Sequence, residues 1–308
     1  MEFVDLQAFL HAATLGGLTR AGERLGVSKS IISRRLAKLE DELGARLLTR
    51  TTRGISLTEA GTEFLVYAQR ILHDAEEARA AIAGQDGELA GQLRLAAPLA
   101  FGIRHLAPAL AIFAERHPRL AIDVSYGDHV HDIVRDGYDA AIRIGSLGNS
   151  SLLARRITSI RSVVAASPAY LARRGTPQTP QDLSRHEALI YASTRDPGTW
   201  VFDGKPRPIS VRVQGRMRAD SGEALAAAAL AGLGIGVFPT FLIYQQLRDG
   251  ELVALLEQTP LPDFPMSLVR PAGPITAKLA LLTDFLMAYF GKDQPWDIAC
   301  RGHDRSNL

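Results

Sequence analysis

The spacing of apolar residues in the first 25 positions predicts two helices. Apolar side chains recur there every three or four residues, which places them on one face of a helix. Gly16 and Gly17 end the first helix, and Thr19 is expected to cap the second, shorter one. The inward-facing residues are Leu6, Phe9, Leu10 and Ala13 in the first helix and Ala21 and Leu25 in the second.

A third helix is expected after a tight turn at Gly26 and Val27, with Ser28 as its N-cap. Its apolar stripe faces the core, and its opposite face is short, polar or basic, which suits close approach to a DNA groove. Two short helices joined by a glycine turn in this way form a helix-turn-helix. The stripe is Ile32, Leu36, Leu39 and Leu43, and the polar face is Lys29, Ser30, Ser33, Arg34 and Ala37.

A β-hairpin is expected next, because residues 46–50 and 55–57 flank a polar tip at residues 51–54. Its basic residues Arg50 and Arg53 can reach backbone phosphates, which is typical of the wing of a winged helix domain.

From Thr58 to Gly84 the apolar positions alternate by three and four residues, a heptad pattern. It predicts a linker helix over residues 58–88 that packs against a second copy of the chain. A helix packed on its own domain is the alternative interpretation. The predicted dimerisation residues are Phe64, Ala68, Ile71, Ala75, Ala78 and Ile82.

Beyond residue 90, strands alternate with helices, which predicts α/β lobes with mostly parallel sheets. The chain is expected to cross from one lobe to the other near residue 162 and to return near residue 265. Lobe 1 is then residues 91–162 and 266–290, and lobe 2 is residues 163–265. The expected strands are 93–97, 121–126, 140–144, 163–166, 189–190, 211–213, 234–238 and 266–270, and the expected helices are 104–115, 131–136 and 275–289.

Composition is that of a globular protein of 308 residues, with 46% hydrophobic and 22% charged positions. The single cysteine, Cys300, excludes an internal disulfide, and we expect neither a metal nor a cofactor. Because no signal sequence and no apolar run of about 20 residues is present, a cytoplasmic location without a membrane partner is expected.

The net charge is only +2, but positive charge is concentrated in one stretch. Between Arg20 and Arg53 there are nine basic and four acidic residues. This pattern indicates a local phosphate-binding surface, although a solvated face can have the same composition.

Two sets of ordered motifs run through the chain. The first is Leu25-Gly26-Val27-Ser28-Lys29-Ser30, Ile32-Ser33-Arg34, Leu39-Glu40, Leu43-Gly44, Leu47-Leu48, Arg50-Thr51 and Leu57-Thr58-Glu59-Ala60-Gly61. The second is Asp139-Ala140-Ala141-Ile142-Arg143-Ile144-Gly145, Leu152-Leu153-Ala154-Arg155-Arg156, Ala166-Ser167-Pro168-Ala169-Tyr170-Leu171 and Ala231-Gly232-Leu233-Gly234-Ile235-Gly236-Val237-Phe238-Pro239. Together they resemble the LysR-type transcriptional regulator family from residue 1 to about residue 290.

The resemblance implies three parts: a winged helix-turn-helix domain (1–60), the dimerising linker helix (58–88) and a two-lobed α/β effector domain (91–290), similar to periplasmic binding proteins. A mobile tail (291–308) is expected to follow. The implied function is sequence-specific binding of double-stranded DNA at an interrupted palindromic operator, as a homodimer or homotetramer. A small-molecule effector, an organic acid or an aromatic compound, would change oligomer geometry and DNA bending, and RNA polymerase is a candidate partner.

Carried over residue by residue, the resemblance places DNA contacts on the third helix, with phosphate contacts from the wing. Lys29 stands where the family commonly has Gln, which can change base preference, and Leu48 stands where Phe is common. The candidate DNA-binding residues are Thr19, Ser28, Lys29, Ser30, Ser33, Arg34, Arg50 and Arg53.

Effector residues are expected at strand ends, in the crevice between the lobes. Many members have Ser or Thr at the first strand end, whereas this chain has an apolar segment, which favours an apolar or aromatic ligand or a site shifted toward Arg143. Phe101 and Trp200 have a second interpretation as core residues, and Arg143 as part of a structural salt bridge. The candidates are Pro98, Leu99, Ala100, Phe101, Asp128, His129, Arg143, Gly145, Trp200, Asp220 and Ser221.

Two other function classes compete with a regulator. An enzyme is disfavoured because no nucleophile elbow, phosphate loop or HExxH helix is present. A solute-binding transport protein would suit the two lobes alone, but not the helix-turn-helix. Sequence-specific DNA binding separates a regulator from both.

Overall fold

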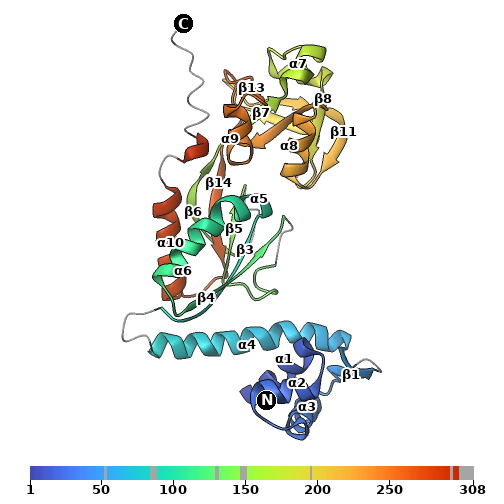
Figure 1. The fold of residues 1–308 in the computed structure, drawn as a ribbon, viewed down its shortest axis with the longest axis vertical. Coiled ribbons are helices and arrows are strands. Elements are labelled where there is room, and N and C mark those ends of the chain that lie inside the picture. Colours follow the sequence, from blue (N-terminus) through green and yellow to red (C-terminus); the bar gives the residue numbers. More distant parts are fainter. Residues whose placement is uncertain are drawn as a thin grey trace. The chain divides into compact units, whose positions relative to one another are not determined.

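The computed structural model describes residues 1–51, 54–83, 89–128, 132–145, 151–194, 196–291 and 294–297 (Figure 1). The chain forms two compact units. The first contains Met1–Arg94 with the short segments His117–Ala121 and His131–Asp139. The second contains Leu95–Arg116, Ile122–Val130 and Ala140–Leu308. Among the described residues, no helix is long and apolar enough to cross a membrane.

The N-terminal helical domain consists of α1 (Phe3–Leu15), α2 (Leu18–Leu25) and α3 (Lys29–Leu43). Its three helices share one core, in which Phe9, Ile32 and Leu39 are fully buried. The turn between α2 and α3 needs glycine at two positions. Gly26 has φ +66°, and a Cβ on Gly22 would lie 2.5 Å from the Val27 carbonyl oxygen. The predicted helix-turn-helix is confirmed.

Two details of these helices differ from prediction. The N-cap of α2 is Gly17, and Thr19 lies exposed in the first turn of the helix, so it is not the cap. Leu43 is 39% exposed because it is the last residue of α3, beyond the packed stripe. Glu40, four residues after Leu36, occupies the inward-facing position instead.

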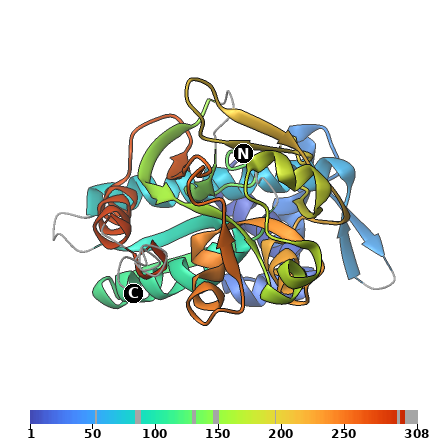
Figure 2. The same cartoon turned by 90° about the horizontal axis from the view of Figure 1, so that it is seen from above.

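The predicted hairpin consists of β1 (Leu48–Thr51) and β2 (Gly54–Leu57), paired antiparallel with Leu48 opposite Leu57. It projects from the helices in both views (Figures 1 and 2). β2 is held to the C-cap of α1, since the Ile55 amide donates to the Gly16 carbonyl at 3.4 Å.

The long helix α4 (Glu59–Ala83) begins after Thr58, as predicted. Its first half packs on its own domain: Ala68 is fully buried, and the Phe64 ring lies 5.4 Å from that of Phe9. Ile71 packs against the same core. For these three residues the contacts favour the alternative interpretation, a helix packed on its own domain, and their assignment to a dimer interface stays a prediction. Ala75 is half-buried, and the side chains of Ala78 and Ile82 lie outside the described residues.

Lobe 1 contains a five-stranded sheet in the order β4-β3-β5-β14-β6. β3 is parallel to β5, whereas β14 is antiparallel to both β5 and β6. Its strands are β3 (Gly91–Ala97), β4 (Leu120–Tyr126), β5 (Ala140–Ile144), β6 (Leu153–Ile160) and β14 (Phe264–Arg270). Its helical segments are α5 (Leu99–Phe101), η2 (Gly102–Leu106), α6 (Ala107–Arg116) and α10 (Ala277–Phe290).

Lobe 2 contains a second five-stranded sheet in the order β11-β8-β12-β7-β13 and a two-stranded ribbon of β9 and β10. Its strands are β7 (Ser162–Ala166), β8 (Glu187–Tyr191), β9 (Thr199–Phe202), β10 (Ile209–Arg212), β11 (Gln214–Ala219), β12 (Ile235–Pro239) and β13 (Val253–Leu255). Its helical segments are α7 (Pro168–Arg174), η3 (Pro180–Arg185), α8 (Gly222–Leu230) and α9 (Thr240–Arg248).

The sheets are mixed, which corrects the expectation of mostly parallel pairing. β7 and β13, at one edge of the lobe 2 sheet, run antiparallel to their neighbours, as β14 does in lobe 1. β7 and β14 begin where the chain changes lobe, between Ile160 and Ser162 and again between Leu255 and Phe264. Such strands enter from the other lobe, so no β-α-β connection fixes their direction.

Two further expectations are corrected, the second only for the residues that the structure describes. The helix expected at residues 131–136 is a turn among the described residues, closed by a 2.7 Å bond from the Asp136 amide to the Asp132 carbonyl. Gly137, with φ +69°, ends it before a helix can form. The tail expected to be mobile contains a helical turn within residues 294–297, in which Trp296 is 3% exposed.

Candidate nucleic-acid interface and effector pocket

The solvent-facing surface of α3 carries the predicted DNA-contacting side chains. Ser28 caps the helix, since its Oγ accepts from the Ile31 amide at 3.4 Å, as predicted. Lys29, Ser30 and Arg34 are exposed and Ser33 is half-buried, so the helix presents small hydroxyls between two cations.

The acidic groups near this face are paired at the far end of α3. Lys38 Nζ lies 2.5 Å from Glu2 Oε1, and this hydrogen bond lowers the pKa of the Glu2 carboxyl. The N-terminal ammonium group pairs with Glu42. Within the described part of the chain, Lys29 and Arg34 form no ion pair. The two cations remain available to an external anion or base.

The other predicted contacts are placed only in part. Thr19 is exposed at the start of α2, where a backbone phosphate can be reached. The side chain of Arg50 and the whole of Arg53 lie outside the described residues.

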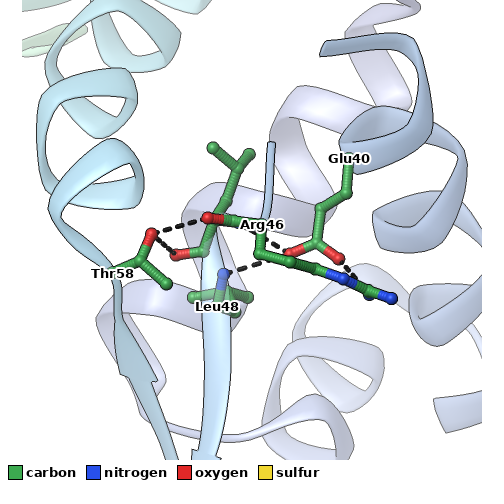
Figure 3. Close-up of polar contacts among 5 residues, drawn as sticks. Glu40, Arg46, Leu48 and Thr58 are labelled. Carbon is green, nitrogen blue, oxygen red and sulfur yellow. Dashed lines mark hydrogen bonds and ion pairs between the residues drawn. The ribbon is translucent and has the colours of Figure 1, made fainter. Parts of the chain in front are cut away.

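A buried carboxylate joins α3 to the wing (Figure 3). Glu40, 8% exposed, accepts from the amides of Leu47 and Leu48 at 2.8 and 3.1 Å, both on Oε1. Its Oε2 accepts from Arg46 Nη1 at 2.8 Å. We call this arrangement the Glu40 junction.

The balance of forces at the Glu40 junction favours the ionised carboxylate. Burial alone raises the pKa of the Glu40 carboxyl, but the amides of Leu48 and Leu47 and the Arg46 guanidinium together outweigh it. The pKa is therefore below its ordinary value of 4.5.

The start of α4 is fastened to the same segment. Thr58 Oγ1 donates to the Arg46 carbonyl at 2.7 Å (Figure 3). The same oxygen accepts from the Gly61 amide at 2.9 Å. A Cβ on Gly61 would lie 1.9 Å from the Leu47 carbonyl oxygen, so the helix approaches the wing as closely as glycine permits. Residues 46–48 thus contact both α3 and α4.

A cavity of about 230 Å³ lies in the second unit and contains four of the predicted effector residues. Leu99 and Asp128 follow strand ends in lobe 1, and the Leu99 amide donates to Asp128 at 3.0 Å. Ser221 caps α8 through a 3.3 Å bond from the Ala224 amide. The lining residues are Leu99, Gly127, Asp128, Ser193, Asp220 and Ser221.

The lining is acidic and rich in hydroxyl groups. Burial, together with the negative charges of Asp128 and Asp220, raises the pKa of the adjacent Tyr191 hydroxyl, which also has a side-chain hydrogen bond with Ser193. No cation is among the lining residues that the structure describes. The cavity therefore offers hydrogen-bond acceptors and negative charge rather than an anion site.

Several predicted effector residues lie elsewhere. Phe101 is fully buried against His105, Phe241 and Phe290, and Trp200 is in the core of lobe 2, so both are core residues rather than ligand contacts. Both aromatic rings have apolar neighbours that exclude solvent. Pro98, Ala100, Arg143 and Gly145 are half-buried but do not line the cavity, and His129 lies outside the described residues.

Sequence reasoning missed Ser193, Tyr191 and the role of Glu40. Ser193 and Tyr191 lie at the carboxyl end of β8. Asp128 became a candidate because it lies at the corresponding end of another strand, but the strand expected here was only residues 189–190, so its end was not recognised. Glu40 follows Leu36 by one helical turn, so a charged residue in an inward-facing position was the available signal.

Comparison with known proteins agrees with this geometry. A bacterial regulatory helix-turn-helix model of the lysR family matches residues 3–62, and a LysR substrate binding domain model matches residues 86–291. The chain belongs to the LysR family. It is a LysR-type DNA-binding transcriptional regulator with a two-lobed substrate-binding effector domain. The relatives are regulators, and no enzyme family is indicated.

Individual LysR-type proteins resemble most of the chain. A Haemophilus influenzae helix-turn-helix regulator, uncharacterised, is 38% identical over 78% of this chain and 83% of its own length. The structure of CrgA from Neisseria meningitidis is 32% identical, with a TM-score of 0.59 over 95% of this chain and 100% of that chain. Full-length AphB, a virulence activator from Vibrio cholerae, is 26% identical, with a TM-score of 0.60 over 94% of this chain and 99% of that chain.

The Glu40 junction makes stability depend on pH. Because the folded pKa of Glu40 is depressed, its contribution is complete above pH 4.5 and is lost as pH falls through the lower folded value. Glu40→Gln is expected to lower the free energy of unfolding by about 1–3 kcal/mol at pH 7. The neutral amide is a weaker acceptor for the Leu47 and Leu48 amides and for the Arg46 guanidinium than the carboxylate is. The difference from wild type should shrink at pH 3–4.

Urea unfolding of the full chain at pH 7 and pH 4, followed by circular dichroism, measures this. Glu23→Gln, an exposed carboxylate on α2, is the matched control and should behave as wild type at both pH values. Equal stability loss in Glu40→Gln at both pH values would rule out a depressed folded pKa.

Proposed function

We propose that α3 reads bases in the major groove through Ser33 and Arg34, with Lys29 and Ser30 nearer the helix start. The exposure of Lys29, Ser30 and Arg34, and the lack of ion pairs at the two cations within the described residues, support this role. An arginine in the groove can bond guanine bidentately, which is worth about 1–3 kcal/mol of discrimination. Thr19, Ser28, Arg50 and Arg53 would hold backbone phosphates, which add affinity without sequence information.

The operator is proposed to be an interrupted palindrome bound by a dimer or a dimer of dimers. One chain has one recognition helix, so reading two half-sites requires two copies related by two-fold symmetry. The first half of α4 is used within its own domain, so any contribution of α4 to the dimer comes from its exposed face or its later turns. Tyr67 is exposed there, beside the ion pair of Arg70 and Asp74. RNA polymerase is a further candidate partner of a bound regulator.

The effector is proposed to bind in the cavity lined by Asp128, Asp220, Ser193 and Ser221. Two carboxylates disfavour an organic acid, whose charge they would repel. An aromatic compound carrying amine or hydroxyl donors satisfies both the acidic lining and the apolar contact with Leu99. Binding would change lobe and oligomer geometry, and hence DNA bending, only if the ligand has different affinities for the two arrangements.

DNA binding is tested with purified full-length chain and DNA upstream of its own gene, across a salt series. Arg34→Ala should bind about 10- to 100-fold more weakly than wild type, because base contacts are lost. Ser33→Ala should lose less. Lys38→Ala, whose side chain is paired with Glu2, is the matched cationic control and should bind as wild type. Sedimentation of the same complexes should give, after the mass of the DNA is subtracted, two or four times 33.3 kDa.

Two results would contradict the proposal. Equal binding of wild type, Arg34→Ala and a scrambled fragment, with steep salt dependence, would mean non-specific electrostatic attraction alone. A chain that remains at 33.3 kDa on its DNA would exclude the symmetric arrangement.

The effector class is tested by thermal unfolding with matched small aromatic amines, phenols and carboxylates. Amines or phenols should raise the unfolding midpoint of wild type, and Asp220→Asn should reduce the amine effect at least tenfold in apparent Kd. Glu251→Gln, an exposed lobe 2 carboxylate outside the cavity, is the control. Stabilisation by carboxylates that is insensitive to Asp220→Asn would contradict the assignment.

A further inference from the structure

Trp296 lies in an aromatic cluster formed by residues that are far apart in the sequence. Its indole ring lies 4.3 Å from the His105 ring, centroid to centroid, in an edge-to-face arrangement. The rings of Phe101, Phe290 and Phe241 lie 6.2, 6.4 and 6.5 Å away. At these separations the rings form one packed apolar cluster.

The cluster brings both lobes together. Phe101, His105 and Phe290 belong to lobe 1, whereas Phe241 is on α9 of lobe 2. The Phe101 and Phe241 rings are 5.2 Å apart, and the His105 Nε2 lies 3.1 Å from the Phe241 carbonyl oxygen. Trp296 therefore contacts an interface between lobes rather than the core of one lobe.

Polar bonds attach the same turn to each side. Gln294 Nε2 donates to the Tyr289 carbonyl at 3.1 Å, at the end of α10 in lobe 1. Thr240 Oγ1, at the start of α9 in lobe 2, donates to Asp297 Oδ1 at 3.4 Å. Figure 1 shows this last described turn of the chain beside α9.

These residues lie outside the matched family domain, which ends at residue 291. α10 also ends there, at Phe290, so the turn is an addition to the two-lobed fold. Arg104 in lobe 1 also joins the lobes: it pairs with Glu223 at 3.2 Å, with both side chains exposed, and its Nη1 donates to the Leu242 carbonyl at 2.9 Å. Such an exposed pair contributes little by itself.

We propose that residues 294–297 are a strap that fixes the angle between the two lobes, with Trp296 as its buried anchor. The Trp296 Nε1–H is buried and has no hydrogen-bond partner among the described residues. An unsatisfied buried donor disfavours the docked state, so the strap is held by apolar contact and can be released. This role is independent of the ligand class and of the operator.

The strap is tested by measuring the distance between lobes in the full chain. The background is Cys300→Ser, because Cys300 is the only cysteine. Spin labels are attached at Glu115→Cys in lobe 1 and Arg174→Cys in lobe 2, both exposed. A second pair, Glu115→Cys with Arg155→Cys, lies within lobe 1.

Trp296→Ala should widen or shift the interlobe distance distribution and leave the lobe 1 distribution unchanged, and the unfolding midpoint should fall by roughly 5–10 °C. Trp200→Phe changes the other tryptophan, which is buried within lobe 2, and should leave both distributions unchanged. Asp297→Ala, a milder change, should widen the interlobe distribution to a smaller extent and supplies the test if Trp296→Ala does not fold.

An unchanged interlobe distribution in a folded Trp296→Ala protein, or in Asp297→Ala where that variant supplies the test, would overturn the proposal. Equal widening of both label pairs would also overturn it, because Trp296 would then support lobe 1 rather than the junction.

Discussion

The Glu40 carboxylate determines how the DNA-facing parts of the N-terminal helical domain are arranged. This one buried anion accepts hydrogen bonds from the amides of Leu47 and Leu48 at the start of the wing and from the Arg46 guanidinium in the connecting segment. The residues it holds also carry the carbonyls that bond Thr58, where α4 begins. A buried carboxylate is stable only when its acceptors are satisfied, so α3, wing and α4 are tied to one arrangement. The spacing between α3 and the wing follows from it, and with it the spacing between the proposed base and phosphate contacts.

The effector domain depends on a different constraint, which is that the chain crosses twice between its lobes. The crossing strands lie antiparallel to their neighbours and leave the carboxyl ends of β8 and β11 facing one cavity. Aromatic side chains, rather than a charged network, fill the junction near α5 and α9. Apolar contact has little directionality, so this junction would permit a change in lobe angle once the proposed strap at residues 294–297 is released, whereas the Glu40 junction is held by directional bonds. A sensor with a rigid DNA-binding end and a deformable ligand-binding end suits a regulator.

The sequence predicted the features that neighbouring residues determine, which are helix caps and turns. Ser28 and Thr58 were identified as caps because a hydroxyl before an amphipathic segment has few other roles, and Gly26 marked the turn. It could not separate Phe64 packed on Phe9 from Phe64 packed on a partner, since both bury the same stripe. Phe101 was a candidate because it follows a strand end, and Trp200 because it lies in a loop expected to face the cleft. Either position is also compatible with the core, and distant residues such as Phe241 decide the burial. The turn at residues 294–297, with its buried Trp296, was missed because the polar residues around Trp296 gave no periodicity.

The base-reading role of α3 is tested most directly by selecting binding sites from a random pool of double-stranded DNA with wild type and with Arg34→Ala. Wild type should enrich two inverted half-sites about one helical turn, or a multiple of it, apart. Arg34→Ala should lose the preference at one base position in each half-site and keep it at the others, because a single base contact is removed. Identical preferences from the two proteins, with Arg34→Ala merely weaker, would show that Arg34 binds phosphate and would contradict the account.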